Sequence, residues 1–220
     1  MTAQVIDLAA FIRANTSVIA PPLVPEVRLH LAHEAVPIWQ KTEDELGEIG
    51  LPPPFWAFAW AGGQALARHV LDRPEQVAGR SIVDLASGSG LVGIAAKLAG
   101  AASVLAADID LFAVAAIAIN AELNEVAVEI TGEDLLAASP PAADVILVGD
   151  LFYEKGLAAR CFDWLKQAKE QGSLVLIGDP GRNYLPRAQL QWLAEYVVPV
   201  SRDLEDAEIK RTGVWTIRSC

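Results

Sequence analysis

The chain has 220 residues, of which 17 are Lys or Arg and 28 are Asp or Glu, so its formal net charge is −11 at pH 7. Apolar residues make up 53% and charged residues 20%, which excludes a disordered chain and predicts one folded unit with a sizeable core. The acidic balance disfavours nucleic acid as a partner, because phosphate groups attract a basic protein surface.

The spacing of the cysteines and the lengths of the apolar runs indicate in which cellular compartment the protein acts. Cys161 and Cys220 lie far apart without metal-ligand spacing, which disfavours a disulfide framework and a metal site. The N-terminal segment 1–17 has no basic stretch ahead of its apolar residues, and segment 91–107 is too short and too interrupted to span a bilayer. We therefore expect a cytoplasmic protein that acts as a monomer without a membrane partner.

The first eighty residues contain few apolar runs. Their pattern predicts a helix at 6–15, a strand at 27–31 after a proline-rich break, and a helix at 60–71. We expect residues 1–75 to form an extension packed on the main domain, because such a segment would have a weak core of its own.

From residue 80 onward, short apolar runs alternate with helical patterns. Five strands are predicted at 81–85, 103–108, 126–131, 144–149 and 174–179, with helices at 91–98, 114–121 and 157–168 between them. A weaker helical pattern covers 186–196, and two further strands are predicted at 197–200 and 214–218. This order predicts an α/β domain over residues 76–220 with a mostly parallel, seven-strand sheet.

The strongest local motif is VDLASGSGLVG at 83–93, between a predicted strand and a predicted helix. Gly88, Gly90 and Gly93 match the G-x-G-x-x-G pattern of dinucleotide sites, and Asp108 follows where an acid that binds ribose belongs. Asp84 argues for a different ligand, because a carboxylate at this strand position suits a cationic group. The alternative is a tight turn without a ligand, with Asp108 as a helix cap.

This stretch resembles motif I of the seven-strand methyltransferases that use S-adenosylmethionine, which have a Rossmann-like sheet. The resemblance implies that Asp84 lies near the methionine part of the cofactor, that Gly88 and Gly90 pass beneath it, and that Asp108 accepts hydrogen bonds from the ribose. Ala86 stands where many members have another glycine.

The same resemblance implies three further contacts with the cofactor. Asp134 falls where such enzymes contact the adenine, and Trp60 and Gly149 are expected to lie against the cofactor. A helix cap or a surface acid is an equally good interpretation of Asp134.

Three segments resemble protein-lysine methyltransferases of the seven-strand class: FWAFAWAGGQALARHVLD at 55–72, GDLFYE at 149–154 and GDPGRNY at 178–184. The resemblance covers roughly residues 52–184. Within that class, the three segments resemble enzymes that act on the β subunit of electron transfer flavoprotein. It implies a lysine acceptor, with this β subunit as the protein partner.

Methyl transfer to lysine requires a neutral amine. With a pKa of about 10.4, roughly one lysine in a thousand is neutral near pH 7, which accounts for about 4 kcal/mol of the barrier. Burial beside Phe152, Tyr153 and Trp56 would lower the amine pKa, whereas Asp150 would raise it. We therefore expect Asp150 to accept an N–H hydrogen bond and orient the lone pair, and Tyr153 to act as a second acceptor or an aromatic wall.

Several alternatives stay open. Asp179 and Arg182 are expected to position the protein substrate, although a Pro-Gly turn with a surface ion pair explains them equally well, and Trp56 is as consistent with core packing. The acceptor is alternatively another protein, such as a ribosomal protein, or a small-molecule amine. An NAD-dependent oxidoreductase and a silent cofactor-binding protein are the rival classes. Acidic clusters at 43–48 and 203–208 are expected on solvated loops, where they would attract a basic partner.

Overall fold

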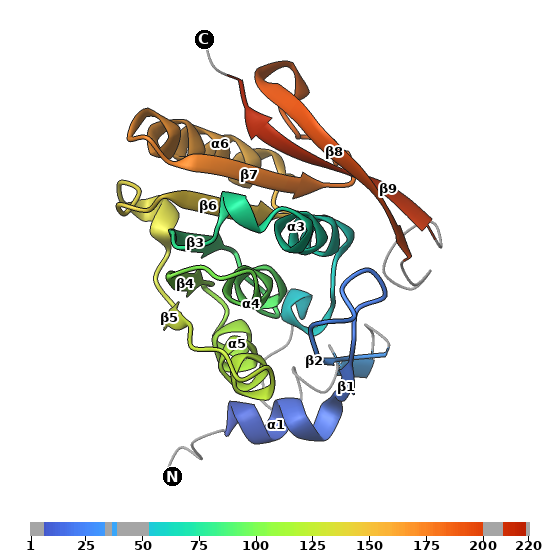
Figure 1. Ribbon diagram of the computed structural model, residues 1–220. Coiled ribbons are helices and arrows are strands. Elements are labelled where there is room, and N and C mark those ends of the chain that lie inside the picture. The colour runs from blue at the N-terminus through green and yellow to red at the C-terminus, as the bar shows by residue number, and fades with distance from the viewer. Residues whose placement is uncertain (1–6, 34–36, 39–52, 200–208, 219–220) are drawn as a thin grey trace.

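The computed structural model describes residues 7–33, 37–38, 53–199 and 209–218, and a seven-strand sheet forms its centre (Figure 1). The strands are β3 (Ser81–Leu85), β4 (Ser103–Ala107), β5 (Glu129–Thr131), β6 (Val145–Gly149), β7 (Leu174–Asp179), β8 (Leu190–Pro199) and β9 (Ile209–Ile217). Their order across the sheet is β5-β4-β3-β6-β7-β9-β8, and β3 to β7 run parallel. The predicted α/β class and seven-strand sheet are confirmed.

Helices cover both faces of this sheet. They are α3 (Ala61–Asp72), α4 (Leu91–Leu98), α5 (Leu111–Leu123) and α6 (Lys155–Glu170), whereas α1 (Leu8–Asn15) packs on α5. Because side chains alternate along a strand, Ile82 packs in one core cluster with α3 and α4, whereas Val83 packs in another with α6. The runs of buried apolar residues in β3 and β6 follow from this double coverage.

The N-terminal part packs against α5. Strands β1 (Ser17–Ile19) and β2 (Leu29–Leu31) pair antiparallel outside the main sheet; β2 falls within the predicted strand 27–31, whereas β1 was not predicted. The Asn120 side chain joins this hairpin to the glycine motif, since it accepts from His30 N at 2.7 Å and donates to Ser89 O at 2.8 Å. The division of the chain at residue 75 stays a prediction.

The C-terminal part differs from its predicted structure. Instead of a helix at 186–196, a single helical turn at Arg187–Gln189 leads directly into β8. Trp192, Tyr196 and Val197 favour an extended chain, and pairing with β9 supplies the backbone hydrogen bonds of this edge strand. The prediction of a helix was therefore wrong, and the strand predicted at 197–200 is the end of a longer one. The acidic clusters lie outside the described residues.

The topology defines where a ligand site is expected. The chain moves from β3 to β4 and β5 on one side and then returns to β6 and β7 on the other, so the order reverses beside β3. In such sheets the crevice forms beyond the carboxyl ends of the strands at this reversal. Among the described residues, no helix combines the length and the apolar composition that crossing a bilayer requires.

Candidate active site

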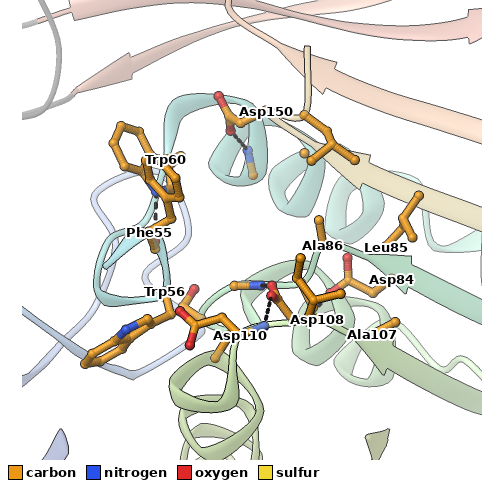
Figure 2. A pocket seen from close by; sticks show the side chains of 18 of the residues that line it. Phe55, Trp56, Trp60, Asp84, Leu85, Ala86, Ala107, Asp108, Asp110 and Asp150 are labelled. Carbon is orange, nitrogen blue, oxygen red and sulfur yellow. Dashed lines mark hydrogen bonds between the residues drawn. The ribbon is translucent and has the colours of Figure 1, made fainter. Parts of the chain in front are cut away.

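A cavity of about 440 Å³ lies beyond the carboxyl ends of the parallel strands (Figure 2). This volume suits a small-molecule ligand. Ten of the residues predicted for the site line it: Trp56, Trp60, Asp84, Gly88, Asp108, Asp134, Gly149, Asp150, Tyr153 and Arg182. The lining does not include Gly90, Phe152 or Asp179.

Asp84 shapes the loop between β3 and α4. Its Oδ2 accepts from Ser87 Oγ at 2.5 Å and from Gly93 N at 2.8 Å. Burial raises the pKa of this carboxyl to about 6. A Cβ on Gly93 would lie 3.0 Å from the same oxygen, so the glycine lets α4 approach β3 closely. The buried carboxylate of Asp84 therefore stabilises the turn between β3 and α4.

Three residues of this turn adopt a left-handed backbone. Gly88 has φ +56° and Gly90 has φ +85°, which glycine adopts without strain. Ala86 has φ +53°, which explains why a glycine would suit its position. Gly90 is the N-cap residue of α4 and does not line the cavity, whereas a Cβ on Gly88 would lie 3.9 Å from Trp56 Cα on the opposite wall.

Asp108 faces this loop from the end of β4. Its Oδ2 accepts from Gly88 N at 2.8 Å and its Oδ1 accepts from Asp110 N at 3.1 Å, and burial raises its pKa. Asp110, which also lines the cavity, caps α5 by accepting from Phe112 N at 2.8 Å. Figure 2 shows the two carboxylates side by side at one end of the cavity. Asp110 was missed, although an acid directly before an apolar helical run is a cap signal.

Asp134 lies at the same end of the cavity as Asp108 and Asp110. It accepts from Leu136 N at 3.1 Å and forms an ion pair with Arg160 of α6. Asp134 and Arg160 both line the cavity, so the aspartate caps a turn and faces the ligand space. Nothing in the sequence marks Arg160, because its partner lies in a different element of the fold. The contact of Asp134 with adenine stays a prediction.

Asp150 stands at the other end of the cavity, after β6. Its Oδ2 accepts from Gly63 N in the first turn of α3 at 2.8 Å, and its Oδ1 accepts from Arg182 Nη2 at 2.9 Å. Burial raises the pKa of Asp150 to about 6, although Arg182 lowers it. The start of α3 fits closely here, since a Cβ on Gly62 would lie 2.3 Å from Gly178 O. Gly63 was missed as a partner of Asp150.

Aromatic rings line the Asp150 end. Trp60 donates from Nε1 to Phe55 O at 2.9 Å, and the Arg182 guanidinium lies over the Trp60 ring at 5.8 Å. The Phe55 and Tyr153 rings lie 5.6 Å apart, and both are partly open to solvent. This end therefore combines one carboxylate, one guanidinium and a wall of aromatic rings.

Three residues predicted to touch the substrate make other contacts in the structure. The indole of Trp56 is turned away from the cavity in Figure 2 and stacks on Phe112 at 5.7 Å, so core packing accounts for the ring. Phe152 is fully buried beside α6. Asp179 accepts from Gly181 N and Arg182 N, which shapes the loop that carries Arg182. Direct contacts of Phe152 and Asp179 with substrate stay predictions.

The residues present fit S-adenosylmethionine. The glycine turn leaves open space where a Cβ would narrow the cavity, and Asp84, Asp108 and Asp110 bring carboxylates to the same end. Carboxylates accept hydrogen bonds from hydroxyl groups and favour a cationic ligand, whereas they would repel a pyrophosphate.

Comparisons with known proteins agree with this geometry. The family model of ribosomal protein L11 methyltransferase matches residues 64–151. Among solved structures, ribosomal protein L11 methylase from Lactobacillus delbrueckii subsp. bulgaricus aligns with a TM-score of 0.52 and 23% identity, covering 74% of this chain and 81% of that one. Magnesium protoporphyrin IX methyltransferase from Synechocystis PCC 6803 with bound SAM aligns with a TM-score of 0.53 and 16% identity, covering 71% and 80%. These two likenesses establish a Rossmann-like methyltransferase fold.

Curated relatives extend over almost the whole chain. The electron transfer flavoprotein beta subunit lysine methyltransferase of Danio rerio is 37% identical over 216 residues, which cover 95% of this chain and 83% of the relative. The protein of the same name from Homo sapiens is 36% identical over 216 residues, covering 95% and 81%. The chain therefore belongs to the family of electron transfer flavoprotein beta subunit lysine methyltransferases.

Proposed function

We propose that this chain transfers methyl groups from S-adenosylmethionine to lysine side chains of the β subunit of electron transfer flavoprotein. One observation carries the proposal: a single cavity has the acidic glycine turn at one end and Asp150 among aromatic rings at the other. Family membership supports both the reaction and the acceptor.

The glycine end would hold the donor, which supplies an electrophilic methyl group on a positively charged sulfur when bound. Asp108, already fixed by two backbone N–H groups, keeps lone pairs for the ribose hydroxyls. Asp84 would place negative charge near the methionine part, and Gly88 would let the backbone pass beneath the ligand. Asp134, Trp60 and Gly149 would complete the contacts.

The Asp150 end would prepare the acceptor. The aromatic rings of Phe55, Trp60 and Tyr153 exclude water from an inserted lysine, and burial favours its neutral amine. Asp150 is held from two sides, so its oxygens are preorganised to accept an N–H and to stabilise the positive charge that grows on nitrogen. Tyr153 adds an aromatic wall beside the methylated product.

The charge of the chain favours the same acceptor side chain. A net charge of −11 attracts a lysine-bearing surface over distances up to about a Debye length, near 8 Å at physiological salt. Added salt is therefore expected to slow association. Cytoplasmic placement and a monomeric state stay predictions.

The test is to incubate purified electron transfer flavoprotein β subunit with this protein and S-adenosylmethionine, and then to measure intact mass and map modified lysines. We expect one or more methyl groups on lysine. Asp150→Ala is expected to lower turnover by about 100-fold or more while retaining cofactor affinity, since one preorganised polar group contributes about 3 kcal/mol to such transition states.

Two outcomes would contradict the proposal. An unmodified β subunit, together with a labelled ribosomal protein or small amine, would move the activity to another acceptor. Undiminished methylation by the Asp150→Ala variant would remove Asp150 from the reaction and leave it a structural cap of α3.

A further inference from the structure

The ion pair between Arg182 and Asp150 lies inside the proposed acceptor end. The two side chains are 21% and 10% exposed, and their charged atoms are 2.9 Å apart. The other carboxylate oxygen accepts from Gly63 N, where the positive end of the α3 dipole lies. Each oxygen of Asp150 therefore faces a positive group of the protein itself.

The groups that act on the charge of Asp150 come from two elements. Gly63 N approaches from the first turn of α3, and Asp179 and Arg182 come from the end of β7 and the loop after it. Tyr153, in the segment after β6, lines the same cavity. Asp179 adds repulsion, but its Oδ1 is already bound to two backbone N–H groups of the loop. Arg182 is therefore the principal positive side chain that faces Asp150 within the described residues.

An unpaired carboxylate would work against the proposed reaction. A carboxylate within about 4–6 Å of an amine favours the ammonium and shifts its pKa upward by about one to three units. Since only the neutral amine carries a free lone pair, such a shift would reduce the reactive fraction about tenfold or more. The reaction therefore requires that Asp150 accepts a hydrogen bond from the lysine while another group compensates its negative charge.

We propose that Arg182 neutralises Asp150, so that the acceptor lysine loses its proton readily while Asp150 still accepts an N–H hydrogen bond. The step affected is the release of one proton from the lysine ammonium to solvent, in which no electrons are transferred. Arg182 is thus a positioning residue that acts through Asp150. The inference rests on the proposed function and deepens it.

The Trp60 ring supports this role by geometry. It lies 5.8 Å from the Arg182 guanidinium, and its own N–H is fixed to Phe55 O. Together with the backbone turn held by Asp179, the ring keeps the guanidinium beside Asp150. A long flexible side chain on a loop would otherwise lose this position to solvent.

The experiment compares wild type with Arg182→Gln and Arg182→Lys. We measure kcat from pH 7 to 10.5 at saturating electron transfer flavoprotein β subunit with labelled S-adenosylmethionine, because the pH dependence of kcat reports the pKa of the bound amine. We expect the rising limb of the kcat profile for Arg182→Gln to move upward by about one pH unit, with roughly tenfold lower kcat at pH 7.5 and a recovery toward wild type at high pH. Arg182→Lys retains the positive charge, so the rising limb of its pH–rate profile is expected to stay at the wild-type position.

A double variant separates charge from simple loop damage. The double variant Asp150→Asn with Arg182→Gln lacks both charges. The rising limb of its pH–rate profile is therefore expected to return to the wild-type position, even though its maximal rate is lower. If Arg182→Gln lowers the rate by the same factor at every pH, Arg182 only supports the loop and the proposal is overturned.

A measurement without any acceptor tests the pairing by itself. Carboxyl NMR of the free protein is expected to show that Arg182→Gln raises the pKa of Asp150 above its wild-type value of about 6. An unchanged titration overturns the inference for any acceptor. A wild-type enzyme that leaves the β subunit unlabelled would instead contradict the proposed function.

Discussion

The two ends of the cavity hold their carboxylates in different ways. At the glycine end, Asp84 and Asp108 are bound by backbone N–H groups and one hydroxyl from residues 3, 9 and 20 positions away in the chain. At the acceptor end, Asp150 is bound by Gly63 and Arg182, which lie 87 and 32 residues away. One end is built from consecutive elements of the chain, whereas the other is assembled from three distant segments.

This difference matters for electrostatics. The neutral donors that bind Asp84 and Asp108 leave both carboxylates with their negative charge, which suits a cationic donor molecule. A guanidinium at the acceptor end cancels the charge of Asp150, which suits an amine that has to lose a proton. The same type of side chain can thus serve two tasks because its partners differ.

The largest effect is expected where α3 meets the acceptor end. Gly62→Ala would place a Cβ 2.3 Å from Gly178 O and 2.6 Å from Asp150 Oδ2. We expect the free energy of unfolding to fall by about 3 kcal/mol, because backbone atoms must move. Denaturant unfolding measures this loss.

Its neighbour provides a matched control. A Cβ on Gly63 would meet only Val92 Cγ2, at 3.9 Å, so Gly63→Ala is expected to leave stability unchanged or to raise it by up to about 1 kcal/mol. Equal midpoints for the two variants would show that the acceptor end does not depend on close packing.

At the glycine end, Asp108→Ala is expected to weaken binding of S-adenosylhomocysteine about 100-fold. Hydrogen bonds to a charged group contribute about 1.5–3 kcal/mol each, and the variant also releases Gly88 N. Calorimetry measures the affinity. Asp144→Ala removes the same charge at the amino ends of the parallel strands, and an equal loss of affinity there would show that the effect comes from net charge alone.

A smaller effect concerns pH. The pKa of Asp84 is about 6 in the folded protein against 3.8 for a free side chain, because the carboxyl is buried. The folded state therefore binds more protons between these values, and this contribution to stability is present below about pH 4 and lost as the pH rises to 6.

Comparison with Asp84→Asn isolates that contribution. Between pH 4 and 6 the free energy of unfolding of wild type is expected to fall relative to the variant by about 2 kcal/mol. A difference between the two proteins that stays constant over this range would contradict the buried, charged state of Asp84.

The smallest effect is expected at the turn itself. Ala86→Gly relieves a left-handed backbone at φ +53° and is expected to raise the free energy of unfolding by up to about 1 kcal/mol. Ala138→Gly, at an exposed residue with φ −129°, has no such strain to relieve and is expected to lose a little stability. Equal changes at both positions would show that Ala86 is not strained.

The glycine end was predictable because its signal is local. Strand, turn and helix follow one another between residues 81 and 98, and Asp108 directly follows the next strand, so residue types and spacing were sufficient to predict that these groups lie together. The structure brings Asp84, Gly88 and Asp108 to one cavity wall, whereas Gly90 does not line the cavity.

The acceptor end was predictable only in part. The sequence identified Asp150, Tyr153 and Arg182, but their pairing depends on tertiary packing that no spacing encodes. The helix predicted at 186–196 failed for a related reason, since β8 is an edge strand whose conformation is decided by its pairing with β9.

Calorimetric titration tests the central claim most directly, because the account depends on a cavity that binds a cationic sulfur nucleoside. We expect wild type to bind S-adenosylmethionine and S-adenosylhomocysteine at one site per chain, and NADH not at all. Binding of NADH alone would contradict the account and make the glycine turn a dinucleotide site.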